Sequence, residues 1–248
     1  MSKIAIFGGT FDPVHWGHLL LAETAFDQFH LDRVIWVPTL RPSYKAPPLL
    51  AFEHRLEMVR RAIAAHPGFT VSAVNGQSSD RSYAIETFNL LQALEPNALW
   101  HWIVGNDAFQ SLPKWQDSHV LMKQCLWLVA PRVLEGEGRE ERREGRGEQK
   151  EEPSFPDGQP MEISIQEDQS TLKNLRALTS SPPHPLTPLP PHLSTLSPHL
   201  RWYPLQMPSV AISSSLIRSR CREGRSIRYL VPEAVHSYIV GQNLYQMS

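Results

Sequence analysis

Cysteine is nearly absent from this chain of 248 residues, which contains only Cys125 and Cys221. Their spacing matches neither a metal site nor a disulfide framework, which favours a reducing compartment. Apolar runs of the roughly 18 residues that cross a bilayer are also missing, and the formal net charge is only −1. We therefore expect a protein of the cytoplasm with a sizeable core and with no nucleic-acid or membrane partner.

Apolar residues become scarce in one part of the chain. Residues 133–152 hold eight Glu and five Lys or Arg, and residues 181–198 hold seven of the 22 prolines. Neither stretch can bury enough apolar surface to offset the entropy lost on ordering. We expect one domain formed by residues 1–132 and 201–248. It is interrupted by a disordered insertion at 133–200, which either serves a partner or is a tolerated surface segment.

Short apolar runs and helical stripes alternate through the rest of the chain. Strands are predicted at 4–7, 34–37, 69–74, 99–104, 126–130 and 210–212. Helices are predicted at 18–29, 53–65, 84–94 and 216–223, followed by a terminal helix with Pro232 in its first turn. This alternation predicts an α/β fold built on a parallel sheet.

The first predicted strand leads through a glycine pair into a loop and a helix, an arrangement that favours anion binding. Gly8 and Gly9 let the backbone approach a ligand, and the helix start adds unpaired N–H groups and the positive end of the helix dipole. His15 and His18 are three residues apart, so both imidazoles can face one phosphate. Gly17 leaves room for a nucleotide beside the backbone. Two histidines at a helix start are also common as capping or surface residues, so spacing alone leaves both interpretations open.

The whole string GGTFDPVHWGHL, residues 8–19, decides between them. It matches neither the P-loop nor the dinucleotide-binding pattern. It resembles the signature of the HxGH nucleotidyltransferase superfamily, in the form typical of nicotinate mononucleotide adenylyltransferases. The resemblance implies a Rossmann-like open parallel sheet with helices on both faces. It also implies an ATP site that includes Gly8, Gly9, Thr10, Phe11 and Gly17.

A second helix start near the other end of the chain suits the same ligand. Ser213 and Ser215 precede the helix predicted at 216–223, where serines also serve as N-caps. Arg218 lies just inside it, and a guanidinium is suited to phosphate. The segment ISSSLIR resembles the superfamily's ISxTxIR signature, which implies that Ser213, Ser215 and Arg218 hold ATP.

The resemblance also assigns the second substrate. Lys45 matches a basic residue of the family, whereas Tyr44 replaces the family's histidine in the same loop. Tyr83 lies in SYA where the family has SYT, so the last hydroxyl is missing, and whether Thr87, one turn on, replaces it stays open.

Two more residues follow the strand predicted at 99–104. Asp107 can accept a hydrogen bond from a ribose hydroxyl or cap a helix, and the two roles are compatible. Trp115, in LPKW, matches the family residue that stacks on the nicotinate ring, although a tryptophan is by itself more often a core residue.

Together these motifs imply adenylyl transfer from ATP to nicotinate mononucleotide, with Mg²⁺ bridging the phosphates. His15, His18 and Arg218 are the predicted catalytic residues, and no metal-ligand spacing accompanies them. Two alternatives stay open: a pantetheine phosphate adenylyltransferase, which has the same fold and ATP site, and a catalytically silent nucleotide-binding regulator. The sequence does not decide between the acid and amide mononucleotides or between a monomer and a homo-oligomer.

Overall fold

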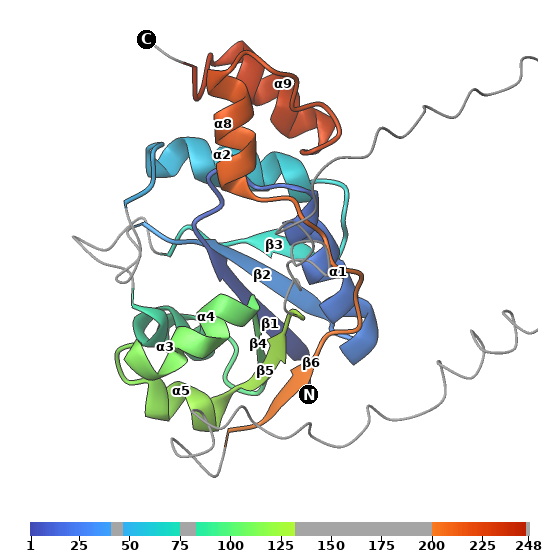
Figure 1. The fold of residues 1–248 in the computed structure, drawn as a ribbon. Coiled ribbons are helices and arrows are strands. Elements are labelled where there is room, and N and C mark those ends of the chain that lie inside the picture. The colour runs from blue at the N-terminus through green and yellow to red at the C-terminus, as the bar shows by residue number, and fades with distance from the viewer. Residues whose placement is uncertain (41–46, 75–82, 132–199, 247–248) are drawn as a thin grey trace, which may run out of the picture. The chain divides into compact units, whose positions relative to one another are not determined.

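The computed structural model describes residues 1–40, 47–74, 83–131 and 200–246 (Figure 1). All of them fall in one compact unit, Met1–Leu134 together with Leu186–Ser248. The predicted insertion lies outside the described residues except for Leu200. Leu200 is 5% exposed and packs in the core. None of the helices in the described ranges is long and apolar enough to cross a bilayer.

A single parallel sheet forms the centre of this unit (Figure 1). Its order is β3-β2-β1-β4-β5-β6 over the described residues. The strands are β1 Lys3–Gly9, β2 Arg33–Pro38, β3 Phe69–Val71, β4 Leu99–Val104, β5 Leu126–Val129 and β6 Trp202–Pro204. The strand order reverses between β1 and β4, and in open α/β sheets ligands bind outside the carboxyl ends of the strands at such a point.

Helices cover both faces of the sheet because alternate strand residues point to opposite sides. Ala5 and Phe7 of β1 belong to one buried cluster. It packs under α1 Trp16–Phe29, α2 Phe52–Ile63, α8 Ser214–Arg222 and α9 Glu233–Gly241. Ile4 and Ile6 belong to the opposite cluster. This one packs under α3 Ala84–Leu94, α4 Asn106–Ser111, the 3-10 turn η2 Leu112–Lys114 and α5 Ser118–Gln124. The predicted α/β class with helices on both faces is confirmed.

The last strand is not where the sequence predicted it. Residues 210–212 form no strand, and the sixth strand is β6, which pairs with β5 through Trp202 opposite Trp127. Pro204 makes this segment a poor strand candidate by sequence, but β6 ends the sheet order, and proline is tolerated on edge strands. Leu205 prolongs the pairing by donating its N–H to the carbonyl of Val129, at 2.8 Å.

This correction predicts different costs for two similar truncations. Leu205 is 2% exposed in the cluster under α8, so Leu205→Ala should lower the free energy of unfolding by about 2–4 kcal/mol. Val210 is only partly buried, so Val210→Ala should cost less than about 1 kcal/mol. Urea unfolding of both variants checks this prediction. A larger loss of stability in Val210→Ala than in Leu205→Ala would instead favour the strand predicted at 210–212.

Candidate active site

The loop after β1 brings two histidines to the start of α1. His15 is the N-cap, with extended φ and ψ of −150° and 171°, and His18 is the third helical residue. Phe11 adopts a left-handed φ of 50° that turns its ring into the core. The ring lies edge-on to His18, with centroids 5.1 Å apart. Phe11 therefore packs against His18 from the core side, and its side chain is too buried to reach a ligand.

The two imidazoles stack on each other, and their contact fixes which nitrogen of His18 carries a proton. The ring centroids are 3.7 Å apart with 28° between the planes. The backbone N–H of His15 donates to Nδ1 of His18 at 3.3 Å. Because Nδ1 accepts this bond, a neutral His18 carries its proton on Nε2 and can donate it from there.

Burial keeps His15 neutral. Its side chain is 6% exposed, and burial lowers its pKa from 6.5 to about 4. Its side chain faces the backbone N–H of His18 in a capping box, but among the described residues its Nδ1 makes no full hydrogen bond. A buried nitrogen without a partner is unfavourable, and a polar group of a ligand would satisfy it.

The glycines of the motif serve different purposes. A Cβ at Gly17 would lie 3.0 Å from Nδ1 of His15, and one at Gly9 would lie 2.8 Å from the ring of Phe11. Gly9 therefore makes room for the ring of Phe11, and Gly17 makes room for the imidazole of His15. The room for a nucleotide at Gly17 stays a prediction. Gly8 is exposed, and a Cβ there would meet nothing within 4 Å. Only Gly8 faces open space where a ligand can approach.

The start of α8 is hydrogen-bonded directly to the loop that leads into α1. Ser214 Oγ donates to the carbonyl of Pro13 at 2.9 Å, and Arg218 Nη1 donates to the carbonyl of Asp12 at 2.8 Å. Arg218 Nη2 also donates to Ser215 Oγ at 3.2 Å. The two helix starts thus meet without the neighbouring strand that the sequence predicted.

Two further groups at the α8 start bear on the phosphate site. Ser213 is the N-cap, and its Oγ accepts a hydrogen bond from the N–H of Leu216 at 3.1 Å. Nε of Arg218 is buried without a partner among the described residues. Like Nδ1 of His15, it is a polar atom that a bound phosphate would satisfy.

The residues predicted for the second substrate lie on the β4 side of the sheet. Asp107 is exposed in the first turn of α4, where Gly105 is the N-cap, so the capping alternative was wrong. Trp115 is half-buried against the edges of Trp102 and Trp127, with Nε1 donating to a serine hydroxyl.

Two more of the residues predicted for the second substrate lie at the start of α3. Tyr83 is the half-buried N-cap of α3. Thr87 is 4% exposed and donates to the carbonyl of Tyr83 at 3.3 Å. The Thr87 hydroxyl is therefore buried and already bonded to the backbone, so it does not take the place of the hydroxyl that the family has at the third position of SYT. Lys45 and Tyr44 lie outside the described residues.

Arg55 is a buried residue that the sequence analysis missed. Its side chain is 1% exposed, and burial lowers its pKa. Nη1 donates to the carbonyls of Thr10 and Thr39, each at 2.7 Å. Arg55 thus ties the loop after β1 to the loop after β2. The signal was a charged residue on the apolar stripe of α2, next to Leu56 and Val59.

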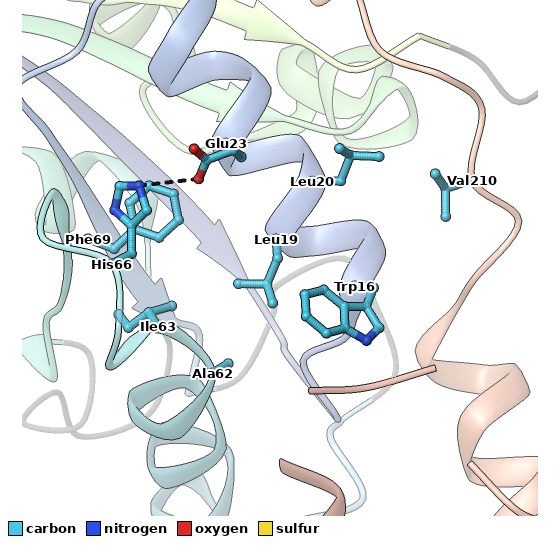
Figure 2. A pocket seen from close by; sticks show the side chains of 9 residues that line it. All are labelled: Trp16, Leu19, Leu20, Glu23, Ala62, Ile63, His66, Phe69 and Val210. Atoms are coloured by element: carbon cyan, nitrogen blue, oxygen red, sulfur yellow. Dashed lines mark ion pairs between the residues drawn. The ribbon is translucent and has the colours of Figure 1, made fainter. Parts of the chain in front are cut away.

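A pocket of about 470 Å³ lies beside α1, but His15, His18 and Arg218 do not line it (Figure 2). Its walls are largely apolar, with Trp16 and Val210 on one side and the ion pair between His66 and Glu23, at 3.2 Å, on the other (Figure 2). An apolar wall beside a carboxylate does not suit a triphosphate. The joined helix starts are therefore the candidate site. In the described part of the chain no cluster of three or more His, Cys, Asp or Glu residues could hold a metal ion.

The surroundings of Gly8 and Gly9 predict that alanine at one position impairs ATP binding and alanine at the other impairs stability. Gly9→Ala should lower the free energy of unfolding by about 1–3 kcal/mol, because the new methyl group overlaps the buried ring of Phe11. Gly8→Ala should leave stability within about 0.5 kcal/mol of the parent and weaken ATP binding. Denaturant unfolding and ATP titration measure both effects. Equal destabilisation by the two variants would contradict this account.

The low pKa of His15 predicts a loss of stability in acid. The folded pKa of about 4 lies below the unfolded value of 6.5. Neutral His15 therefore makes its full contribution to the free energy of unfolding above pH 6.5, and this contribution declines as the pH falls from 6.5 towards 4. Between about pH 7.5 and about pH 5 it should decrease by about 2 kcal/mol. His15→Gln, which does not titrate, should lack this part of the loss. Unfolding curves at both pH values test it, and identical losses in the two proteins would refute it.

Comparisons with known proteins agree with the geometry. The family model described as cytidylyltransferase-like matches residues 6–220. The probable nicotinate-nucleotide adenylyltransferases of Trichormus variabilis and of a Nostoc species are 41% and 40% identical, each over 99% of this chain and 98% of the relative. A solved structure of Plasmodium falciparum nicotinic acid mononucleotide adenylyltransferase complexed with APC shares the fold, with a TM-score of 0.62 at 17% identity over 99% of this chain and 98% of that one. This chain therefore belongs to the cytidylyltransferase-like family, among its nicotinate-nucleotide adenylyltransferases.

Proposed function

We propose that the protein transfers the adenylyl group of ATP to nicotinate mononucleotide, giving nicotinate adenine dinucleotide and pyrophosphate in NAD synthesis. The observation that carries this proposal is the hydrogen-bonded junction between the starts of α1 and α8. Relatives named for this activity match the chain over nearly their whole length, and a structural neighbour is described as complexed with NaAD.

The junction suits a triphosphate because three kinds of donor meet there. Each helix start contributes the positive end of its dipole, and the N–H groups of Gly17, Ser214 and Ser215 lie beside those of Trp16, His18 and Leu216, which already donate within the protein. His18 contributes Nε2–H, and Arg218 contributes a guanidinium whose position is fixed by the carbonyl of Asp12. In the proposal, His15 and Thr10 bind phosphate oxygens beside them, and Ser213 and Ser215 complete the ATP site with Gly8.

The reaction needs charge stabilisation more than proton transfer. An oxygen of the mononucleotide's 5′-phosphate attacks the α-phosphorus of ATP, and a new P–O bond forms there. The bond from the α-phosphorus to the bridging oxygen breaks, and that oxygen leaves with pyrophosphate and its electron pair. The attacking oxygen is already an anion, so no side chain has to remove a proton. His18 and Arg218 then act by neutralising charge on the transferred and leaving groups.

Mg²⁺ enters the proposal with ATP. The donors at the junction are N–H and guanidinium groups, which suit phosphate oxygens and not a cation. Mg²⁺ is commonly bound through substrate phosphates and water. Bound in this way, the ion would add to the charge neutralisation that His18 and Arg218 provide.

The nicotinate half of the acceptor is proposed to lie on the β4 side of β1. Trp115 is half-buried there, and Asp107 offers an exposed carboxylate eight residues earlier. Tyr83 belongs to this side, and Thr87 acts by holding the start of α3. Lys45 is proposed to bind the same acceptor. We also propose that residues 133–200 interrupt a single catalytic domain, and that the enzyme works in the cytoplasm.

Pyrophosphate release from ATP and Mg²⁺ tests this function. We expect release with nicotinate mononucleotide, and we expect His18→Ala to lower kcat by about 100-fold or more, as for a lost oxyanion donor, with little change in KM. His119→Ala, which removes an exposed histidine of α5, is the matched control and should keep full activity.

Different results lead to different conclusions. Release with phosphopantetheine but not with nicotinate mononucleotide would keep the ATP site and overturn the acceptor. Silence with both and with nicotinamide mononucleotide would favour the nucleotide-binding regulator. A change confined to KM in His18→Ala would remove the transition-state role of His18.

A further inference from the structure

Tyr245, close to the chain's C-terminal end, contacts the loop that carries His15. Its hydroxyl donates to Oδ1 of Asp12 at 2.6 Å, across 233 residues of sequence. The tyrosine is 8% exposed, the aspartate 3%. Burial and the neighbouring carboxylate of Asp12 both raise the pKa of Tyr245. The hydroxyl therefore remains protonated at neutral pH and can act as the donor.

Asp12 connects this contact to the catalytic groups. Its Oδ2 accepts a hydrogen bond from the N–H of Leu49 at 2.8 Å, so each carboxylate oxygen has one donor from a remote part of the chain. Its main-chain carbonyl accepts the bond from Nη1 of Arg218. His15 follows three residues later. One buried residue therefore determines where Arg218 and the start of α1 lie.

We propose that Tyr245 is a positioning residue for adenylyl transfer, which holds the Asp12 carboxylate and thereby fixes the carbonyl that orients Arg218. This inference rests on the proposed function. The hydroxyl of Tyr245 is bonded to Asp12, and Asp12 is bonded to Arg218, so the effect of Tyr245 on the guanidinium passes through Asp12. The end of the chain thus contributes to the geometry of a site built mainly from β1, α1 and α8.

Removing the hydroxyl has a defined consequence. In Tyr245→Phe the ring still fills its space, but within the described part of the chain the buried carboxylate keeps only the donor from Leu49. A charged group that loses a hydrogen bond in the interior is strongly disfavoured. Asp12 would turn to find a new partner, and its carbonyl would leave Arg218. A displaced guanidinium stabilises the transition state less well, while the helix-start N–H groups still bind ATP.

The chain offers a matched control for this substitution. Tyr238, in α9, also uses its hydroxyl in a long-range contact, with Nδ1 of His54 at 3.0 Å. That contact joins α9 to α2 and does not involve Asp12. Tyr238→Phe therefore removes a C-terminal phenol hydroxyl without touching the catalytic loop.

The experiment compares kcat and KM for ATP in the two variants with thermal unfolding as a check on folding. Tyr245→Phe should lower kcat by about tenfold or more at nearly constant KM, and Tyr238→Phe should leave both unchanged. In an Arg218→Ala background, Tyr245→Phe should have little further effect on kcat, because its target is gone. A loss of melting temperature without a loss of kcat, or independent effects of Tyr245 and Arg218, would overturn the proposal.

Hydrogen exchange separates this inference from the proposed function. The amides of residues 11–15 should exchange faster in Tyr245→Phe than in the parent or in Tyr238→Phe. An inactive parent would remove the proposed function, and the exchange rates alone would then decide whether Tyr245 holds the loop. Unchanged exchange at residues 11–15 would overturn the positioning role in either case.

Discussion

The site depends on the hydrogen bonds by which α8 is fixed to the loop after β1. Arg218 and Ser214 donate to the carbonyls of two successive residues, Asp12 and Pro13. These contacts join elements about 200 residues apart and bring two helix starts together. A triphosphate carries its charge along several ångströms, so a single helix start neutralises only part of it. The joined starts are what make this surface suited to ATP.

The conformation of the loop is set from inside the protein. Phe11 turns into the core through a left-handed backbone and supports His18. Gly9 and Gly17 leave space for the rings of Phe11 and His15. Arg55 holds the carbonyl of Thr10 from below. Much of the motif therefore encodes packing that holds two imidazoles at the start of α1, one buried and one partly exposed.

The sequence predicted the parts of the fold and site that are local. Five of six strands and the two helix starts that the proposal assigns to phosphate followed from apolar periodicity, glycine and the motifs around His18 and Arg218. The prediction of the last strand was wrong because Pro204 made the true edge strand, β6, look unfavourable. Residues 210–212 are apolar because Val210 lines the pocket beside α1 and Ile212 packs against the core. Arg55 and Tyr245 were missed because their roles arise from contacts between distant segments, which leave little or no local pattern.

The most direct test of the account is a crystal structure with a non-hydrolysable ATP analogue and nicotinate mononucleotide. The account predicts that the triphosphate lies between the starts of α1 and α8, within hydrogen-bond distance of Nε2 of His18 and of the guanidinium of Arg218. The 5′-phosphate of the mononucleotide should face the α-phosphorus from the β4 side. A triphosphate bound elsewhere, such as in the apolar pocket beside Trp16, would contradict it.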